Sequence, residues 1–123
     1  MDVPYPSLTG VITNPKSALD RLIRDYFYAD GAKHGINLMR RSFRKDINGN
    51  EPVADNVKNS LDFIISRYFP LYTISCIETN VIGTRRFLEL TITITDDGTT
   101  HTLEDIVAIE DGALAEIIKN THL

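Results

Sequence analysis

The feature that most constrains this fold is a change in hydrophobic period on either side of Pro70. Before it, apolar residues recur every three or four positions, which is the spacing of one amphipathic helix. After it, apolar and polar residues alternate from Phe87 to Thr95, which predicts a half-buried strand rich in β-branched residues. The helical stripe consists of Val57, Leu61, Ile64, Ile65 and Tyr68, and the apolar side of the strand of Leu88, Leu90, Ile92 and Ile94.

Local signals place the other elements around this pair. Asn14 and Pro15 are typical of the cap and first position of a helix, which should extend to about Ala29. Its apolar stripe consists of Ala18, Leu19, Leu22, Ile23, Tyr26 and Phe27, and the aromatic run Tyr26-Phe27-Tyr28 is interpreted as core packing. The predicted strands are Tyr72–Thr79, Phe87–Thr95 and Thr100–Ile109, with a hairpin turn at Asp96-Asp97-Gly98 and a short final helix over Ala113–Asn120.

The pattern therefore predicts an α+β fold, in which a small antiparallel meander of about three strands packs on the central helix. Its 123 residues suit one domain, residues 14–123, preceded by an extended arm over residues 1–13. We expect no membrane span and no secretory signal. Cys76 is the only cysteine, which excludes an intramolecular disulfide, fits a reducing interior and suggests a small buried side chain. The stretch from Gly31 to Asn50 is interpreted as a functional loop or contact segment, with a short helix around Leu38–Arg44 or a strand near Ile36–Met39.

Sequence motifs for catalysis, cofactors or metals are missing. His34, His101 and His122 lie far apart, and no phosphate-binding loop, dinucleotide motif or nucleophile elbow occurs. The hairpin could gather four carboxylates, as a catalytic pair or a hard-cation site would require. We favour an exposed acidic tip instead, since carboxylates usually lie at the surface. The four are Asp96, Asp97, Glu104 and Asp105. We expect neither an enzyme nor a cofactor.

The net charge of −4 is unevenly distributed along the chain. Residues 16–45 carry eight basic and three acidic side chains, whereas residues 46–123 carry five basic and thirteen acidic ones. Such a division would suit subunits that stack head to tail, but two solvated faces explain it equally well. The basic segment includes Arg40, Arg41, Arg44 and Lys45. An acidic domain without a nucleic-acid motif favours a protein contact or simple solvation there over nucleic-acid binding.

Residues 52–109 resemble the baseplate-wedge or sheath-initiator family of contractile phage tails and type VI secretion baseplates, also described as W-type or lysozyme-like. The similar stretches are Val53-Ala54-Asp55-Asn56-Val57, Arg67-Tyr68-Phe69-Pro70-Leu71, Ile74–Ile77 and Leu88–Ile94. The family has a Glu-Pro-Arg signature after the helix, of which this chain keeps only Pro70. Phe69 and Leu71 stand at the charged positions, so the partner contact that the family makes there should be apolar here. Phe69-Pro70-Leu71 can equally be interpreted as a helix terminator with two core residues. The motif places no catalytic carboxylate.

The resemblance implies a structural subunit of a tail baseplate, made in the host cytoplasm and incorporated in the virion. Its implied partners are baseplate wedge proteins, the sheath protein and tail tube proteins, with six copies in a ring. It also implies that the subunit joins the baseplate to the first sheath ring by strand addition. Val3–Ile12 would then be this chain's arm, and Thr100–Ile109 or Tyr72–Thr79 the open edge. The alternatives are a tail terminator or neck-completion subunit, or a small nucleic-acid-binding module.

Overall fold

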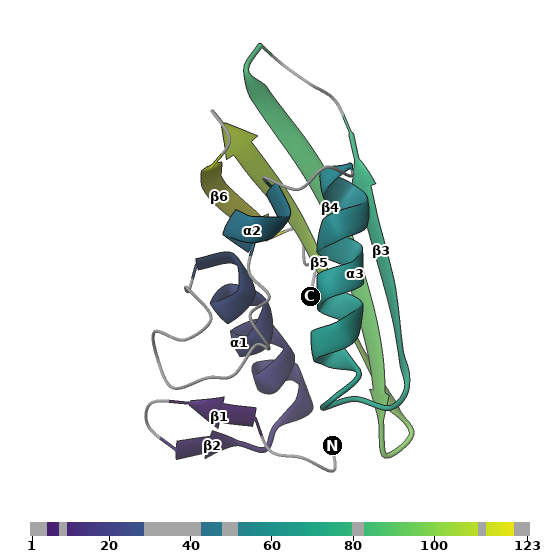
Figure 1. Ribbon diagram of the computed structural model, residues 1–123. Helices are drawn as coiled ribbons and strands as arrows, with labels where there is room; N and C mark the ends of the chain where they lie inside the picture. Colours follow the sequence, from purple (N-terminus) through teal and green to yellow (C-terminus); the bar gives the residue numbers. More distant parts are fainter. Residues whose placement is uncertain are drawn as a thin grey trace.

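The structure is a computed structural model that describes residues 5–7, 10–28, 43–47, 52–79, 83–110 and 113–119. The α+β class is confirmed: helices lie on one face of an antiparallel sheet (Figure 1). The elements in chain order are β1 (Tyr5–Ser7), β2 (Gly10–Ile12), α1 (Pro15–Tyr28), α2 (Phe43–Ile47), α3 (Val53–Ile65), β3 (Tyr72–Glu78), β4 (Arg85–Asp96), β5 (Thr99–Glu110) and β6 (Ala113–Lys119). None of the described helices is both long and apolar enough to cross a lipid bilayer.

The predicted boundaries of the first and central helices agree closely with the structure, whereas the strand or short helix predicted between residues 36 and 44 lies mostly outside the described residues. The Asn14 side-chain oxygen accepts a hydrogen bond from the Ser17 backbone N–H at 3.1 Å, so it caps α1 as expected. Helix α3 ends at Ile65, and a turn over residues 66–68 leads to Pro70. The Phe69 N–H still donates to the Ile65 carbonyl at 2.9 Å, after which the proline prevents further helix.

The main sheet has the order β3-β4-β5-β6, and each strand is antiparallel to its neighbour. Strands β4 and β5 form the predicted hairpin. Its two turn residues, Asp97 and Gly98, have φ values of 50° and 76°. Positive φ at both positions belongs to the two-residue turn whose twist matches that of the paired strands.

The predicted C-terminal helix is wrong, because residues 113–119 form β6 along β5. The pairing shifts by one residue between Ala108 and Ile109, where β6 contains a bulge. A bulge inserts one extra residue, so side chains three positions apart can face the same side of a strand. Leu114 and Ile117 both pack against the core in this way. Their spacing therefore imitates a helical period.

The core lies between the helices and one face of the sheet, here called the covered face. The apolar side of β4 contributes four side chains that are at most 1% exposed, and β5 adds Leu103, Val107 and Ile109. Tyr26, Phe27 and Phe43 pack edge to face, with ring centroids 4.8–6.2 Å apart, and join α1 to α2. Tyr28, the last of the predicted aromatic run, is 61% exposed and does not belong to this core.

The described part of the N-terminal arm is a separate two-stranded sheet. Strands β1 and β2 pair with each other in antiparallel register, with Tyr5 opposite Ile12. In Figure 1 this small hairpin lies beside α1, at a distance from the main sheet.

Candidate functional site: the open margin of the sheet

Among the described strands, β3 has a neighbour on one side only (Figure 1). Its flanking residues show how its backbone is directed: the Thr95 N–H donates to the Leu71 carbonyl at 3.0 Å, and the Thr79 N–H donates to the Phe87 carbonyl at 2.9 Å. In an antiparallel ladder, residues bonded to the neighbour alternate with residues whose N–H and C=O groups point away. The outward-directed residues of β3 are therefore Tyr72, Ile74, Cys76 and Glu78. This row, with no strand paired to it in the described part of the chain, is called the β3 margin.

The β3 margin lacks most of the features that usually keep a sheet edge from pairing. Such edges are protected by lysine, proline, bulges or very short strands. Strand β3 has seven residues, continuous register with β4 and none of these residue types. Its side chains on the open face of the sheet are Thr73, Ser75 and Ile77, and Ile77 is 57% exposed. The margin is therefore competent to accept another strand.

The only charged side chain in β3 is matched within the chain. The Arg86 guanidinium donates two hydrogen bonds to the Glu78 carboxylate, from Nε to Oε1 at 2.6 Å and from Nη2 to Oε2 at 2.9 Å. These bonds lower the pKa of Glu78, against a smaller effect of desolvation, and raise that of Arg86. Since Glu78 is held as a carboxylate beside its own cation, it repels an approaching strand less than a solitary charge would.

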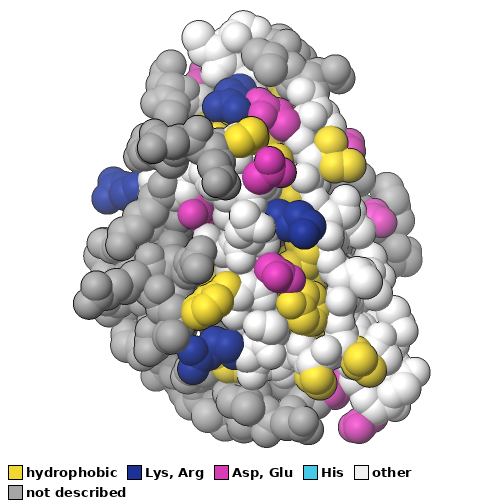
Figure 2. Space-filling view, turned by 45° about the vertical axis from the view of Figure 1, so that its right-hand side comes forward, with side chains coloured by type: hydrophobic (Ala, Val, Ile, Leu, Met, Phe, Trp, Pro, Cys, Tyr) yellow, Lys and Arg dark blue, Asp and Glu magenta, His cyan; other side chains and the backbone are white. Residues whose placement is uncertain are grey.

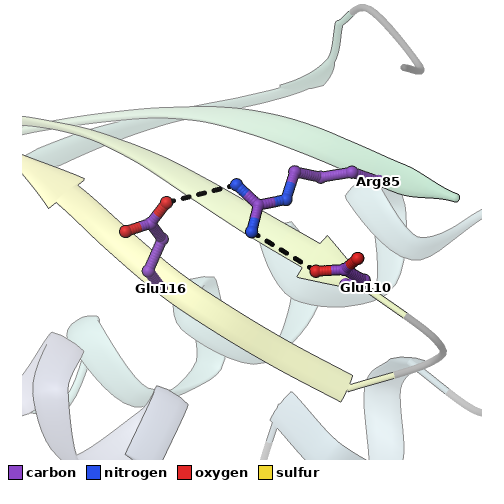
Figure 3. A network of polar contacts seen from close by, with 3 residues as sticks. All are labelled: Arg85, Glu110 and Glu116. Carbon is purple, nitrogen blue, oxygen red and sulfur yellow. Dashed lines mark hydrogen bonds and ion pairs between the residues drawn. The ribbon is translucent and has the colours of Figure 1, made fainter. Parts of the chain in front are cut away.

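The opposite margin, at β6, differs in construction. The strand at this margin, β6, is itself bulged. An ion-pair network also links it to its neighbours: Arg85 on β4 contacts Glu110 on β5 and Glu116 on β6, each at 3.3 Å (Figure 3). The bulge is a feature of edges that resist further pairing, whereas the acidic side chains here, like Glu78, are matched within the chain. Of the two margins, β3 is thus the better acceptor.

Of the two predicted candidate edges, Tyr72–Thr79 does lie at the margin of the described sheet, as β3. The other candidate, Thr100–Ile109, is wrong because β5 is paired on both sides. The cause is β6, which occupies the position that a C-terminal helix would have left open.

The three signature positions do not share a surface. Phe69 is 1% exposed and belongs to the core, whereas Pro70 and Leu71 are exposed, Leu71 by 63%. Of the basic candidates, Arg44 is exposed on α2. Lys45 lies in α2, but its side chain is outside the description, and Arg40 and Arg41 lie outside the described residues altogether.

The four hairpin carboxylates are not gathered into one site. Asp96 pairs with Thr99 beside the turn, while Glu104 lies opposite Thr91 on the open face. Asp105 is 2% exposed on the covered face, which the acidic-tip interpretation missed. Strand alternation could have revealed it, since Asp105 has the same parity as Leu103 and Val107. The described residues contain no group of His, Cys, Asp and Glu able to hold a metal ion.

Cys76 is half-buried on β3, where the sequence predicts a small buried side chain. Burial raises the pKa of its thiol to about 12, with smaller contributions from the nearby Asp55 and Glu78. A thiol with such a pKa remains protonated at neutral pH and is a poor nucleophile. Comparison of the chain with protein-family models, curated proteins and solved structures gives no match.

Proposed function

We propose that this chain is a structural subunit of a contractile phage tail baseplate, of the baseplate-wedge or sheath-initiator type. In this proposal it joins the baseplate to the first sheath ring by receiving an extended segment of a neighbouring polypeptide at the β3 margin. The tail assignment rests on the sequence resemblance. The observation that carries strand addition is the margin itself, a seven-residue edge strand without proline, lysine or bulge.

Strand addition draws affinity and register from different groups. Four residues of β3 offer outward N–H and C=O groups, and each net hydrogen bond contributes about 0.5–1.5 kcal/mol. Side chains that alternate between the two faces then fix the register of the incoming strand. These backbone hydrogen bonds depend little on the sequence of the incoming segment. What the margin requires is therefore a segment that can be held extended beside it.

A second contact is proposed at the signature position. Only Pro70 and Leu71 remain at the surface there, so the contact with the wedge would be apolar and centred on Leu71. Figure 2 shows the α3 and β3 side of the molecule, where hydrophobic side chains reach the surface in small groups among charged ones.

A matched pair of double variants tests strand addition. Thr73→Lys with Ser75→Lys places two lysines on the edge strand, and Thr100→Lys with Thr102→Lys places two at the same spacing on the central strand β5. All four positions are exposed on the open face. Lysines protect edges, so particles carrying the β3 pair should lose sheath attachment in electron micrographs, while the β5 pair should retain it.

Both double variants must first show an unchanged unfolding midpoint. Normal sheath attachment with the β3 pair would remove the β3 margin from the proposal. A density for this chain at the far end of the tail, away from the baseplate, would instead favour a terminator or neck subunit.

A further inference from the structure

Helix α3 presents a charged stripe along the β3 margin. Asp55, Lys58 and Asp62 are spaced by three and four residues and therefore share one side of the helix. The Tyr72 hydroxyl donates to Asp62 Oδ1 at 2.6 Å, which places this end of the stripe over the start of β3. The Asp55 carboxylate acts electrostatically on Cys76, further along the same strand. The stripe and the strand thus run side by side in opposite directions.

The side chains of Asp55, Lys58 and Asp62 are exposed, so their charges can pair with those of another molecule. Neither the Asp55 nor the Lys58 side chain makes a hydrogen bond or an ion pair with another described residue. Asp62 uses one oxygen for the Tyr72 hydroxyl. Figure 2, turned to bring this side forward, shows side chains of both signs in the middle of the surface. The order along the margin is acidic, basic, acidic.

A strand added beside β3 would direct every second side chain to the covered face, next to this stripe. Asp55 and Asp62 are separated by seven helical residues, about 10 Å along the axis. Positions i and i+4 of a strand are separated by about 13 Å, a difference that long side chains accommodate. Three alternate side chains of an incoming strand therefore match the three charges.

We propose that the β3 margin selects an extended polypeptide segment with basic, acidic and basic residues at positions i, i+2 and i+4. The two basic side chains would pair with Asp55 and Asp62, and the acidic one with Lys58. This inference rests on the proposed strand addition and specifies the chemistry of the segment that is added. A charge pattern of this kind would set register and exclude segments that pair with the backbone equally well.

Three nine-residue peptides of identical composition test the proposal at equal net charge. Each alternates with threonine and valine and carries two lysines and one glutamate at the alternate positions, in the order Lys-Glu-Lys, Lys-Lys-Glu or Glu-Lys-Lys. Each peptide is labelled, and binding to the full chain is followed by fluorescence anisotropy at low salt. The protein variant Asp55→Lys with Lys58→Asp exchanges the first two charges without changing the net charge, and its unfolding midpoint confirms its fold.

The wild-type chain should bind the Lys-Glu-Lys peptide about tenfold more tightly than either permuted peptide, since two partly exposed pairs are lost in each permutation. In the exchanged variant, one permuted peptide should become the tightest ligand. Equal binding of all three peptides to the wild type would overturn charge selection and leave strand addition intact. If none of the three peptides binds at millimolar concentration, charge selection and strand addition at the β3 margin are both overturned.

Discussion

The two faces of the main sheet are built from the same four strands and differ in almost every other respect. On the covered face, β4 contributes leucine and isoleucine side chains that are at most 1% exposed. On the open face the same strand carries Arg85, the half-buried Phe87, Glu89 and three threonines, two of which contact threonines of β5 at 3.2 and 3.4 Å. The difference indicates that the covered face holds the fold together, whereas the open face and the β3 margin remain available for other molecules.

The sharpest test of this difference uses two neighbouring residues of β4. Ile92 is 0% exposed on the covered face, and Thr93 follows it on the open face. We expect Ile92→Ala to lower the free energy of unfolding by about 2–4 kcal/mol, because it removes buried methyl groups and leaves a cavity. Thr93→Ala should change it by about 0.5 kcal/mol or less. Urea denaturation followed by circular dichroism measures both, and similar values would contradict the assignment of the faces.

A smaller difference in the free energy of unfolding is expected between substitutions of two tyrosines on the helix side of the sheet. Tyr26 is 0% exposed, its hydroxyl donates to Asp46, and burial together with this bond raises its pKa. Tyr26→Phe should lower the free energy of unfolding by about 1–3 kcal/mol, since a partly buried carboxylate loses its donor. Tyr72→Phe removes an exposed bond to Asp62 and should change it by less than about 0.5 kcal/mol. Both are measured by the same denaturation, with near-ultraviolet spectra to confirm retained packing.

The sequence predicted those parts of the fold that depend on local chemistry. The period-two pattern of β4 located the covered face, Asn14 marked the start of α1, and Asp97-Gly98 marked the hairpin. These signals are reliable because each is read over a few neighbouring residues. The C-terminal element was mispredicted for the opposite reason. Its spacing suited a helix, and only the free edge of β5, together with a bulge, made it a strand.

The candidate site was harder to predict, since an edge is a property of the whole sheet. The family resemblance implied an open edge at Tyr72–Thr79 or Thr100–Ile109, and the choice between them required knowledge of β6. The helical period identified the core side of α3 and not its charged stripe. Its position beside the β3 margin follows from the contact between Tyr72 and Asp62, two residues ten apart in the chain.

At the end of the β3 margin, the Glu78–Arg86 pair should make a pH-dependent contribution to the free energy of unfolding. Arg86 lowers the pKa of Glu78 in the folded state. The pair therefore stabilises the fold at pH values above the ordinary carboxyl pKa, and this stabilisation is lost as the pH falls through the folded-state pKa of Glu78. With side chains 28% and 39% exposed, screening limits the effect to about 0.2–1 kcal/mol. Glu78→Gln should therefore be less stable than the wild type at pH 7 and equally stable near pH 2. A constant difference across this range would show that the loss is not electrostatic.

The smallest effect is expected on the open face, where Arg85 bridges Glu110 and Glu116 with side chains 38–51% exposed. Because these charges are solvated and both distances are 3.3 Å, Arg85→Met should change the free energy of unfolding by about 0.5 kcal/mol or less, and 0.5 M salt should abolish the change. A loss above about 1 kcal/mol that survives salt would mean that this network holds β6 in place. The open face would then stabilise the fold at β6, as the covered face does, and the difference between the two faces would not hold for that strand.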